Sequence, residues 1–201
     1  GEGIIEFPEN DPRKLHIGIF ENGRPHGNGK VEYRDGITDI GEYNIDGEFT
    51  LGKRSYPNGS SDIGKYIKGE FFLGKTNYNN GCTDIGQYIE GEFSLGKRTY
   101  SDGATIITMW EKGKPIGQVL GTHPEGFMCV GGVRKGHLDG NVSIIYPDGG
   151  TYVGGMKRSK RHGKGTYTDS NGKRVNGLFE QNEFKLSKSK LPEINKLPGA
   201  L

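Results

Sequence analysis

The chain has 201 residues, enough for one or two ordinary domains, but only 31% are apolar and 36 are glycines, which excludes a thick hydrophobic core. Aromatic residues still make up 10% of the chain, and charges of both signs are spread along it, unlike a disordered sequence. We therefore expect a thin, extended, sheet-like structure whose core is a file of aromatic side chains.

The net charge of +2 is unevenly distributed. From Lys157 onward there are eleven Lys or Arg residues against four Asp or Glu residues, which can mark a surface that meets acidic partners or anionic membrane. The cysteines, Cys82 and Cys129, lie far apart and outside any paired motif, as is typical of reduced thiols in an intracellular protein. We expect a cytoplasmic protein, with peripheral association at a membrane or the cytoskeleton as the alternative.

The chain begins with GEGIIEF (residues 1–7), which matches the second half of a repeat whose next copy is GNGKVEY (residues 27–33). Because the sequence starts in mid-repeat without an initiator methionine, we expect the natural protein to extend upstream. A glycine then recurs every 22 or 23 residues, with Thr108 in the one missing place, at Gly18, Gly41, Gly64, Gly86, Gly131, Gly154 and Gly177.

Each copy of the repeat predicts two short strands followed by a turn. In the copy around Gly41, residues 39–44 and 52–56 are the strands, and strand alternation places Gly41 and Tyr43 on one face. The glycines allow neighbouring rings to lie flat on the backbone. Asn-Gly or Asp-Gly pairs, such as Asp35-Gly36 and Asn58-Gly59, supply the positive φ that tight turns need.

The stretch GEFFLGKT (residues 69–76) fits the phosphate-binding pattern G-x-x-x-x-G-K-[ST]. It is nevertheless the middle member of three near-copies, with GEFTLGKR (residues 47–54) and GEFSLGKR (residues 91–98) on either side. A nucleotide site also needs a helix straight after the lysine, whereas Thr76 is followed by the turn-forming run NYNNG. We expect a strand here and no nucleotide.

Towards the C-terminus, TYVGGMK (residues 151–157) followed by RHGKGTY (residues 161–167) resembles the MORN repeat, the membrane occupation and recognition nexus. Residues 20–36 resemble it as well, the three middle copies depart from it with Glu-Phe-x-Leu-Gly, and the copy at residues 108–126 is eroded. The resemblance implies an all-β array of repeated hairpins in a single-layer antiparallel sheet. We expect about eight repeats over residues 1–184, followed by a non-repeat tail over residues 185–201.

A single-layer sheet cannot bury both faces, so part of its aromatic face is available to a partner. The resemblance implies a groove on the aromatic face. The residues predicted to line this groove and bind a peptide or helix of another protein are Tyr43, Tyr56, Tyr66, Tyr78, Tyr88, Tyr100, Arg54 and Arg98. Packing among the rings alone explains them equally well. The resulting prediction is a non-catalytic interaction or scaffold module that uses no cofactor and binds no nucleic acid.

Two alternatives remain open. A membrane-associating module would bind anionic phospholipid through the basic residues Lys157, Arg158, Lys160, Arg161 and Lys164, which otherwise form a solvated loop. The resemblance also allows an accessory domain of a larger enzyme, such as a lipid kinase or a SET-type methyltransferase. A carbohydrate-binding repeat is disfavoured because that type depends on tryptophan pairs, and the chain has only Trp110.

Charge ladders also recur at the repeat period. Glu48, Glu70 and Glu92 form one ladder, and a second consists of Lys53, Lys75 and Lys97. Both ladders are typical of solvated faces. Asp39, Asp62 and Asp84 form a third, for which calcium is a weaker alternative. Because the spacing matches neither the EF-hand nor the glycine-aspartate nonapeptide, we predict no metal site.

Overall fold

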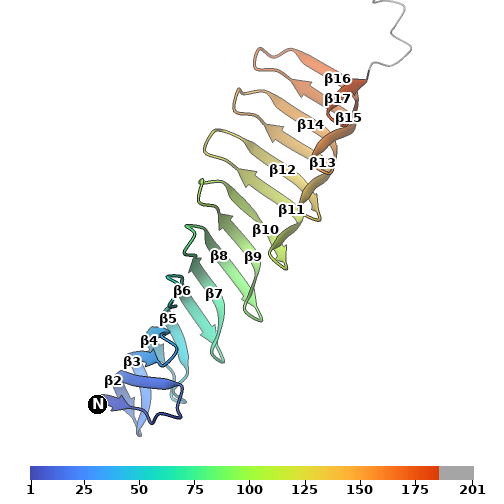
Figure 1. Ribbon diagram of the computed structural model, residues 1–201. Coiled ribbons are helices and arrows are strands. Elements are labelled where there is room, and N and C mark those ends of the chain that lie inside the picture. The colour runs from blue at the N-terminus through green and yellow to red at the C-terminus, as the bar shows by residue number, and fades with distance from the viewer. Residues whose placement is uncertain (186–201) are drawn as a thin grey trace, which may run out of the picture. The chain divides into compact units, whose positions relative to one another are not determined.

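The computed structural model describes residues 1–185, which form seventeen β-strands and no helix. The chain divides into two compact units, Gly1–Asp102 and Gly103–Leu201. Within each unit every strand pairs antiparallel with its neighbours in the chain, as Figure 1 shows. The predicted all-β fold of antiparallel hairpins in a single sheet layer is therefore confirmed.

The first unit contains nine strands. They are β1 (Glu2–Glu6), β2 (Arg13–Glu21), β3 (Arg24–Tyr33), β4 (Thr38–Tyr43), β5 (Phe49–Ser55), β6 (Ser61–Ile67), β7 (Glu70–Asn77), β8 (Thr83–Ile89) and β9 (Glu92–Thr99). Strand β7 contains most of the phosphate-loop-like stretch, and the chain runs straight from Lys75 through Thr76 without starting a helix. The expectation of a strand at this position is confirmed.

The described part of the second unit contains eight strands. They are β10 (Thr105–Glu111), β11 (Lys114–Thr122), β12 (Met128–Arg134), β13 (His137–Ile145), β14 (Thr151–Lys157), β15 (Lys160–Thr168), β16 (Arg174–Glu180) and β17 (Glu183–Lys185). No helix within residues 1–185 is long and apolar enough to cross a membrane. The single array over residues 1–184 stays a prediction, and the predicted tail, apart from Lys185 in β17, lies outside the described residues.

Two kinds of turn alternate along the chain. At one end of most hairpins both central residues have positive φ, as at Lys68 (50°) and Gly69 (79°), which is the type I′ geometry that suits a right-handed strand twist. The turn between β4 and β5 differs, because only Gly47 has positive φ there, at 81°. At the other end only the glycine of the predicted pair has positive φ, such as Gly36 at 86°. Asp35 has a different role there, because its Oδ1 accepts a hydrogen bond from the Ile37 amide at 3.0 Å.

The recurring glycines form one continuous row across the first unit. Gly29 lies opposite Gly41 on one side, Gly41 lies opposite Gly52, and Gly52 lies opposite Gly64. A Cβ added to Gly41 would stand 2.7 Å from the Cα of Gly52 and would also overlap the Leu51 carbonyl. Only glycine permits so close an approach of two strands, so the row fixes their spacing.

Rings cover this glycine row because each middle hairpin contains a β-bulge. The register shifts so that Glu42 pairs with Leu51 and Tyr43 pairs with Phe49, which leaves Thr50 as the extra residue. The bulge turns Phe49 onto the same face as Gly52, where a Cβ would lie 2.9 Å from the end of the ring. The pattern Glu-Phe-x-Leu-Gly therefore specifies a bulge at x and a ring over the glycine.

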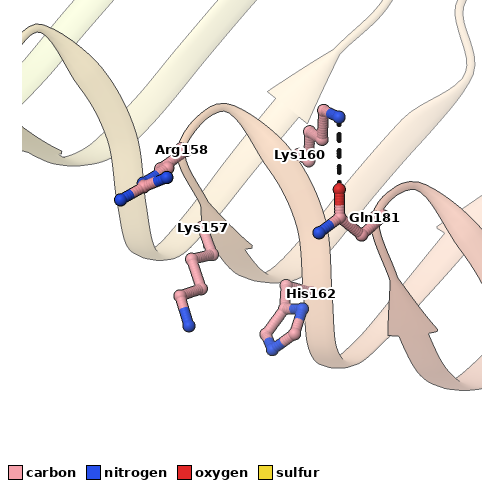
Figure 2. A pocket seen from close by; sticks show the side chains of 5 residues that line it. All are labelled: Lys157, Arg158, Lys160, His162 and Gln181. Atoms are coloured by element: carbon pink, nitrogen blue, oxygen red, sulfur yellow. Dashed lines mark hydrogen bonds between the residues drawn. The ribbon is translucent and has the colours of Figure 1, made fainter.

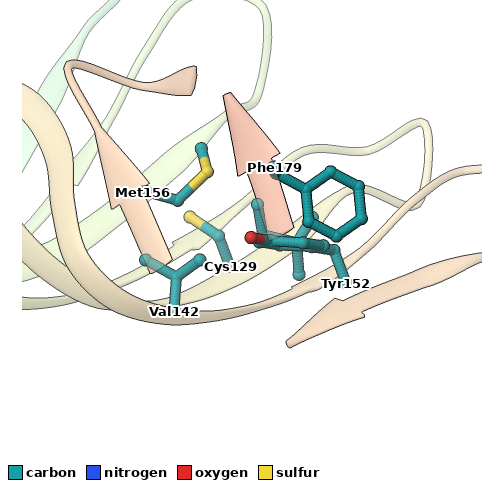
Figure 3. Packing of buried hydrophobic residues seen from close by; sticks show 6 residues of the cluster. Cys129, Val142, Tyr152, Met156 and Phe179 are labelled. Carbon is teal, nitrogen blue, oxygen red and sulfur yellow. The ribbon is translucent and has the colours of Figure 1, made fainter. Parts of the chain in front are cut away.

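The second unit has a more conventional core. Cys129, Val142 and Met156 pack beside Tyr152 and Phe179, as Figure 3 shows. The rings of Tyr152 and Phe179 meet edge to face with centroids 5.4 Å apart. Here Tyr152, on the first strand of its hairpin, covers the glycine row, and a Cβ on Gly165 would lie 2.7 Å from Tyr152 Cε2.

The glycine row predicts a sharp effect of one substitution. Gly41→Val should lower the free energy of unfolding by about 3 kcal/mol, because a side chain there overlaps backbone that cannot move aside. Ile40→Val, at the adjacent exposed position, is the matched control and should change stability by less than about 0.5 kcal/mol. Chemical denaturation followed by circular dichroism measures both, and equal stability of the two variants would contradict the role of the row.

Candidate functional site

Six rings form the aromatic ladder on one face of the first unit. They are Tyr43, Phe49, Tyr66, Phe71, Tyr88 and Phe93, and all are buried. Successive centroids are 4.7–5.3 Å apart, with the rings tilted about 50° to one another, for example 49° between Phe49 and Tyr66. Each inner ring is covered by its two neighbours, and Phe49 and Phe71 also lie over the glycine row, so the ladder is the core of this unit.

Beside the ladder, a buried ion pair joins the two strands of the first middle hairpin. Asp39 is 0% exposed, and its two carboxylate oxygens accept hydrogen bonds from Nε and Nη2 of Arg54, both at 2.7 Å. The hydroxyl of Tyr33 donates to the same carboxylate at 3.0 Å. Such two-pronged contacts between a guanidinium and a carboxylate are strong and set the orientation of both groups.

The environment of Arg54 extends to the next hairpin. Its guanidinium carbon lies 5.0 Å from the centroid of the Tyr66 ring, and Nη1 donates to the Gly69 carbonyl at 3.2 Å. Hydrogen bonding to Asp39 raises the pKa of Arg54. Burial, together with the Asp39 charge, raises the pKa of Tyr33 to about 12. Arg54 therefore stays cationic and Tyr33 stays neutral through the physiological range.

The same arrangement recurs two copies later and is altered in between. Arg98 binds Asp84 with Nε at 2.7 Å and Nη2 at 2.6 Å, and Tyr78 donates to Asp84 at 2.8 Å. In the middle copy, Thr76 replaces the arginine and its hydroxyl donates to Asp62 at 2.6 Å. The three aspartates are therefore buried structural groups, whereas the glutamate and lysine ladders are exposed, as expected for solvated faces.

The opposite face of the first unit is exposed and largely aliphatic. We call the following six residues the aliphatic face: Ile40, Leu51, Ile63, Leu73, Ile85 and Leu95. Their exposed fractions range from 38% for Leu73 to 53% for Ile40. Ile40 pairs with Lys53 and Leu51 pairs with Lys65, so isoleucines and leucines alternate with polar residues in two staggered rows.

Four exposed lysines stand within these rows, namely Lys53, Lys65, Lys75 and Lys97. Glu42 and Gln87 take the remaining places opposite the leucines. The rows therefore combine apolar side chains with a net positive charge. Sequence reasoning had not identified this surface, although the recurrence of Ile and Lys at the repeat period was available as a signal.

Comparison with known proteins agrees with the repeat pattern. The family profile of the MORN repeat matches residues 16–38 and 152–174. The chain contains MORN repeats. The matched copies are the two that resemble the family pattern closely in sequence, whereas the copies with buried Asp39, Asp62 and Asp84 lie outside the matched segments. No curated protein matches the chain significantly.

Solved structures similar to this chain include TCP domains from two organisms. One is the TCP domain of SAS-4 (dCPAP) of Drosophila melanogaster in complex with a proline-rich motif of Ana2 (dSTIL); identity is 15%, coverage is 76% of this chain and 73% of that chain, and the TM-score is 0.36. Another is a point mutant of the TCP10 domain of Danio rerio CPAP; identity is 17%, coverage is 88% of this chain and 99% of that chain, and the TM-score is 0.39. For the wild-type domain, identity is 16%, coverage is 88% of this chain and 100% of that chain, and the TM-score is 0.27.

The eight residues predicted to bind a partner all belong to the aromatic side of the first unit. Tyr43, Tyr66 and Tyr88 are buried in the ladder. Tyr56, Tyr78 and Tyr100 are half-buried at the ends of the hairpins, and the first two donate to Asp62 and Asp84. Arg54 and Arg98 bind carboxylates in two-pronged fashion, but those of their own chain. Contact with a partner at these residues stays a prediction.

Sequence reasoning missed the partners of these residues. Phe49, Phe71 and Phe93 supply half of the ladder, and they were visible only as a departure from the family pattern. The aspartates could have been paired with the arginines from spacing, because Asp39 precedes Arg54 by 15 residues and Asp84 precedes Arg98 by 14. Among the described residues there is no group of three or more potential metal ligands.

The five basic residues predicted to face an anionic surface are divided by the structure. Lys157, Arg158 and Lys160 line an open cavity of about 390 Å³ with His162 and Gln181, as Figure 2 shows. Lys160 donates to Gln181 at 3.2 Å. None of these five lining residues is acidic, and Lys164 is exposed on the same strand as Lys160.

Arg161 belongs instead to the core side of its hairpin. Its guanidinium lies 5.2 Å from the Phe179 ring centroid and 5.8 Å from that of Tyr152, and it donates to the Asn182 carbonyl at 3.0 Å. Stacking on rings is a role that arginine fills well. Four of the five predicted residues therefore remain available to an anionic group.

The buried ion pair leads to a prediction about stability. Arg54→Met should lower the free energy of unfolding by about 3–5 kcal/mol, because it leaves the Asp39 carboxylate buried without a cation. The double variant Asp39→Cys, Arg54→Ile reproduces the apolar pair Cys129 and Ile144, which occupies the same register in the second unit, and should regain most of the loss.

Lys53→Met is the surface control, because Lys53 is exposed on the opposite face, and it should cost less than about 0.5 kcal/mol. Urea unfolding curves of the four proteins provide the comparison. A single Arg54 variant as stable as the wild type would show that the ion pair does not hold these strands together.

Proposed function

We propose that this chain is a non-catalytic protein-interaction module whose first unit binds a helical segment of a partner protein along the aliphatic face. The observation that carries the proposal is the exposure of six regularly spaced isoleucines and leucines on one side of the sheet. An exposed face that carries an apolar side chain on every one of six successive strands is typical of a site for protein association. The aromatic ladder is less available, because its rings already cover one another.

The spacing of the rows favours a helix as the occupant. Neighbouring strands lie about 4.8 Å apart. A helix lying across them advances about 5.4 Å per turn, so each turn can set one apolar side chain against each strand. An extended peptide advances about 6.8 Å between side chains on the same face and loses this match after two or three strands. The partner segment should therefore carry apolar residues at helical spacing.

Charge specifies the partner further. Lys53, Lys65, Lys75 and Lys97 flank the apolar side chains, with Glu42 as the acidic residue in the same rows. Complementary potential steers association and selects among partners of similar apolar content. A helix with Asp or Glu beside its apolar stripe fits this surface, and a helix with lysines there is repelled.

A pair of synthetic helical peptides tests this proposal. Both carry the same leucine stripe, but one is flanked by glutamates and the other by lysines. The glutamate peptide should bind at least about tenfold more tightly in isothermal titration. Ile63→Asp combined with Leu73→Asp should weaken it by about thirtyfold or more, as expected for central anchors.

Charge reversal provides the matched control. Lys53→Glu with Lys75→Glu leaves the apolar side chains in place and should reverse the preference between the two peptides. Circular dichroism should show all variants folded, since the altered side chains are exposed. Equal binding of both peptides, or no effect of Ile63→Asp with Leu73→Asp, would show that the aliphatic face is not the binding site.

A second candidate function is favoured by the cavity of Figure 2. Lys157, Arg158 and Lys160 around this cavity would suit an anionic surface such as a membrane rich in acidic phospholipid. The module would then be cytoplasmic and peripheral to the membrane. Whether it also serves as part of a larger enzyme depends on sequence outside this chain.

Vesicle flotation tests the membrane candidate. The chain should bind vesicles that contain anionic phospholipid, release them as salt is raised, and ignore neutral vesicles. Lys157→Glu, Arg158→Glu and Lys160→Glu together should abolish binding, whereas Lys53→Glu with Lys75→Glu should leave it unchanged. Binding to neutral vesicles of the same size would exclude the electrostatic mechanism.

A further inference from the structure

The three middle hairpins of the first unit are near-copies, but one of them lacks an arginine. The position of Arg54 in the first copy is occupied by Thr76 in the second. Asp39 lies opposite Arg54 in the first copy, and Asp62 lies opposite Thr76 in the second. The chain therefore contains both a filled and an unfilled version of one site.

The filled version shows what the site accepts. Around the guanidinium of Arg54 stand the Asp39 carboxylate, the rings of Phe49 and Tyr66, and the Gly69 carbonyl. The corresponding groups in the next copy are Asp62, Phe71, Tyr88 and Gly91, each 22 or 23 residues further along the chain. The same kinds of group are therefore present, in the same order, where no arginine side chain fills the space between them.

An open cavity of about 390 Å³ lies at this place. Asp62, Phe71, Tyr88 and Gly91 line it together with Thr76, so every counterpart of the Arg54 environment is among its walls. The remaining lining residues are Arg54, Tyr56, Ser60, Gly69, Glu70, Tyr78 and Glu90. Thr76 is smaller than the arginine that stands at the equivalent position in the first copy.

Charge makes the cavity selective for a cation. Asp62 is 8% exposed and accepts hydrogen bonds from the hydroxyls of Tyr56, at 2.6 Å, and Thr76, at 2.6 Å. Within residues 1–185 no ion pair neutralises it, in contrast to Asp39 and Asp84. A carboxylate has about four acceptor positions, so Asp62 keeps capacity for further donors. A buried carboxylate without a cation is costly, and binding one would relieve that cost.

We propose that this cavity binds the guanidinium group of an arginine side chain from a partner protein. Asp62 accepts two N–H donors, the Gly91 carbonyl accepts another, and the rings of Tyr88 and Phe71 pack against the planar group. Exposed Glu70 and Glu90 attract the cation at the edge, while Arg54, the opposing charge there, is held by Asp39. A lysine ammonium lacks the planar, two-pronged shape of this site.

The site lies on the aromatic side of the unit, so it goes beyond the proposed helix-binding function of the aliphatic face. Nuclear magnetic resonance of the isotope-labelled full chain tests it, with N-acetyl-arginine amide as the probe. The corresponding lysine and citrulline amides are matched controls. Saturable shifts should appear at the amides of Thr76, Tyr88 and Gly91, at least about tenfold tighter for arginine than for lysine, and citrulline should cause none.

Four variants separate the outcomes. Thr76→Arg should abolish probe binding and keep or raise the melting temperature, because the chain then fills its own cavity as Arg54 does. Asp62→Asn should weaken the probe at least about tenfold. Glu70→Gln with Glu90→Gln alters only exposed side chains, so it folds regardless and should weaken the probe severalfold. Ile63→Asp with Leu73→Asp, on the other face, should not change it.

The proposal is overturned if the wild-type chain shows no saturable shifts at these amides. It is also overturned if lysine or citrulline amide binds as tightly as arginine amide. Unchanged binding by both Asp62→Asn and the double glutamine variant would place the probe elsewhere, and that result holds whether or not Thr76→Arg folds.

Discussion

The structure depends on the close approach of neighbouring strands at the glycine row. At Gly41 and Gly52 there is no room for a Cβ, and the space above the backbone is taken by rings. The rings gain burial without a second sheet or a helical layer, because Phe49 and Phe71 lie on glycine and each inner ring packs against two others. A chain that is 31% apolar can therefore form an ordered sheet. Every other feature, including the ion pairs and the exposed rows, takes its position from this contact.

The glycines are covered by a ring in two different ways within one chain. In the second unit Tyr152 covers the glycines from the first strand of its hairpin. In the middle copies of the first unit Phe49 and Phe71 cover them from the second strand, and the vacated positions on the first strand become Asp39 and Asp62. Once an aspartate is buried there, the opposite residue must satisfy it, by an arginine or by a hydroxyl. The copies that depart from the family pattern therefore differ in three linked positions: the ring moves to the second strand, an aspartate takes its former place, and an arginine or a hydroxyl stands opposite the aspartate.

The sequence predicts the repeat, the strands and the burial side of Tyr43, because glycine recurrence and strand alternation are local properties. It does not predict that Asp39 is buried, since an aspartate beside the apolar Ile40 has the pattern of an exposed position and its partner, Arg54, comes from another strand. The bulge at Thr50 is similarly hidden, because one extra residue reverses which side chains share a face. The arginine-sized cavity at Thr76 follows only when copies are compared in three dimensions. The tyrosines and arginines predicted for the aromatic side do share one face, but the sequence did not predict the contacts that they make within the chain.

The alternating turns have an evolutionary consequence. Gly64 and Ile63 are equivalent to Gly41 and Ile40 one repeat earlier. If one repeat of 22 or 23 residues were removed or duplicated between equivalent turns, each residue would be replaced by its equivalent, and both the glycine row and the aliphatic rows would stay continuous. Recombination within the gene can therefore lengthen or shorten such a sheet by whole hairpins without disturbing the rest. Each added copy would extend the aliphatic face by two strands, and each choice of arginine or threonine opposite the aspartate would close or open a cavity. Copy number and the residue at that single position are then independent variables on which selection can act.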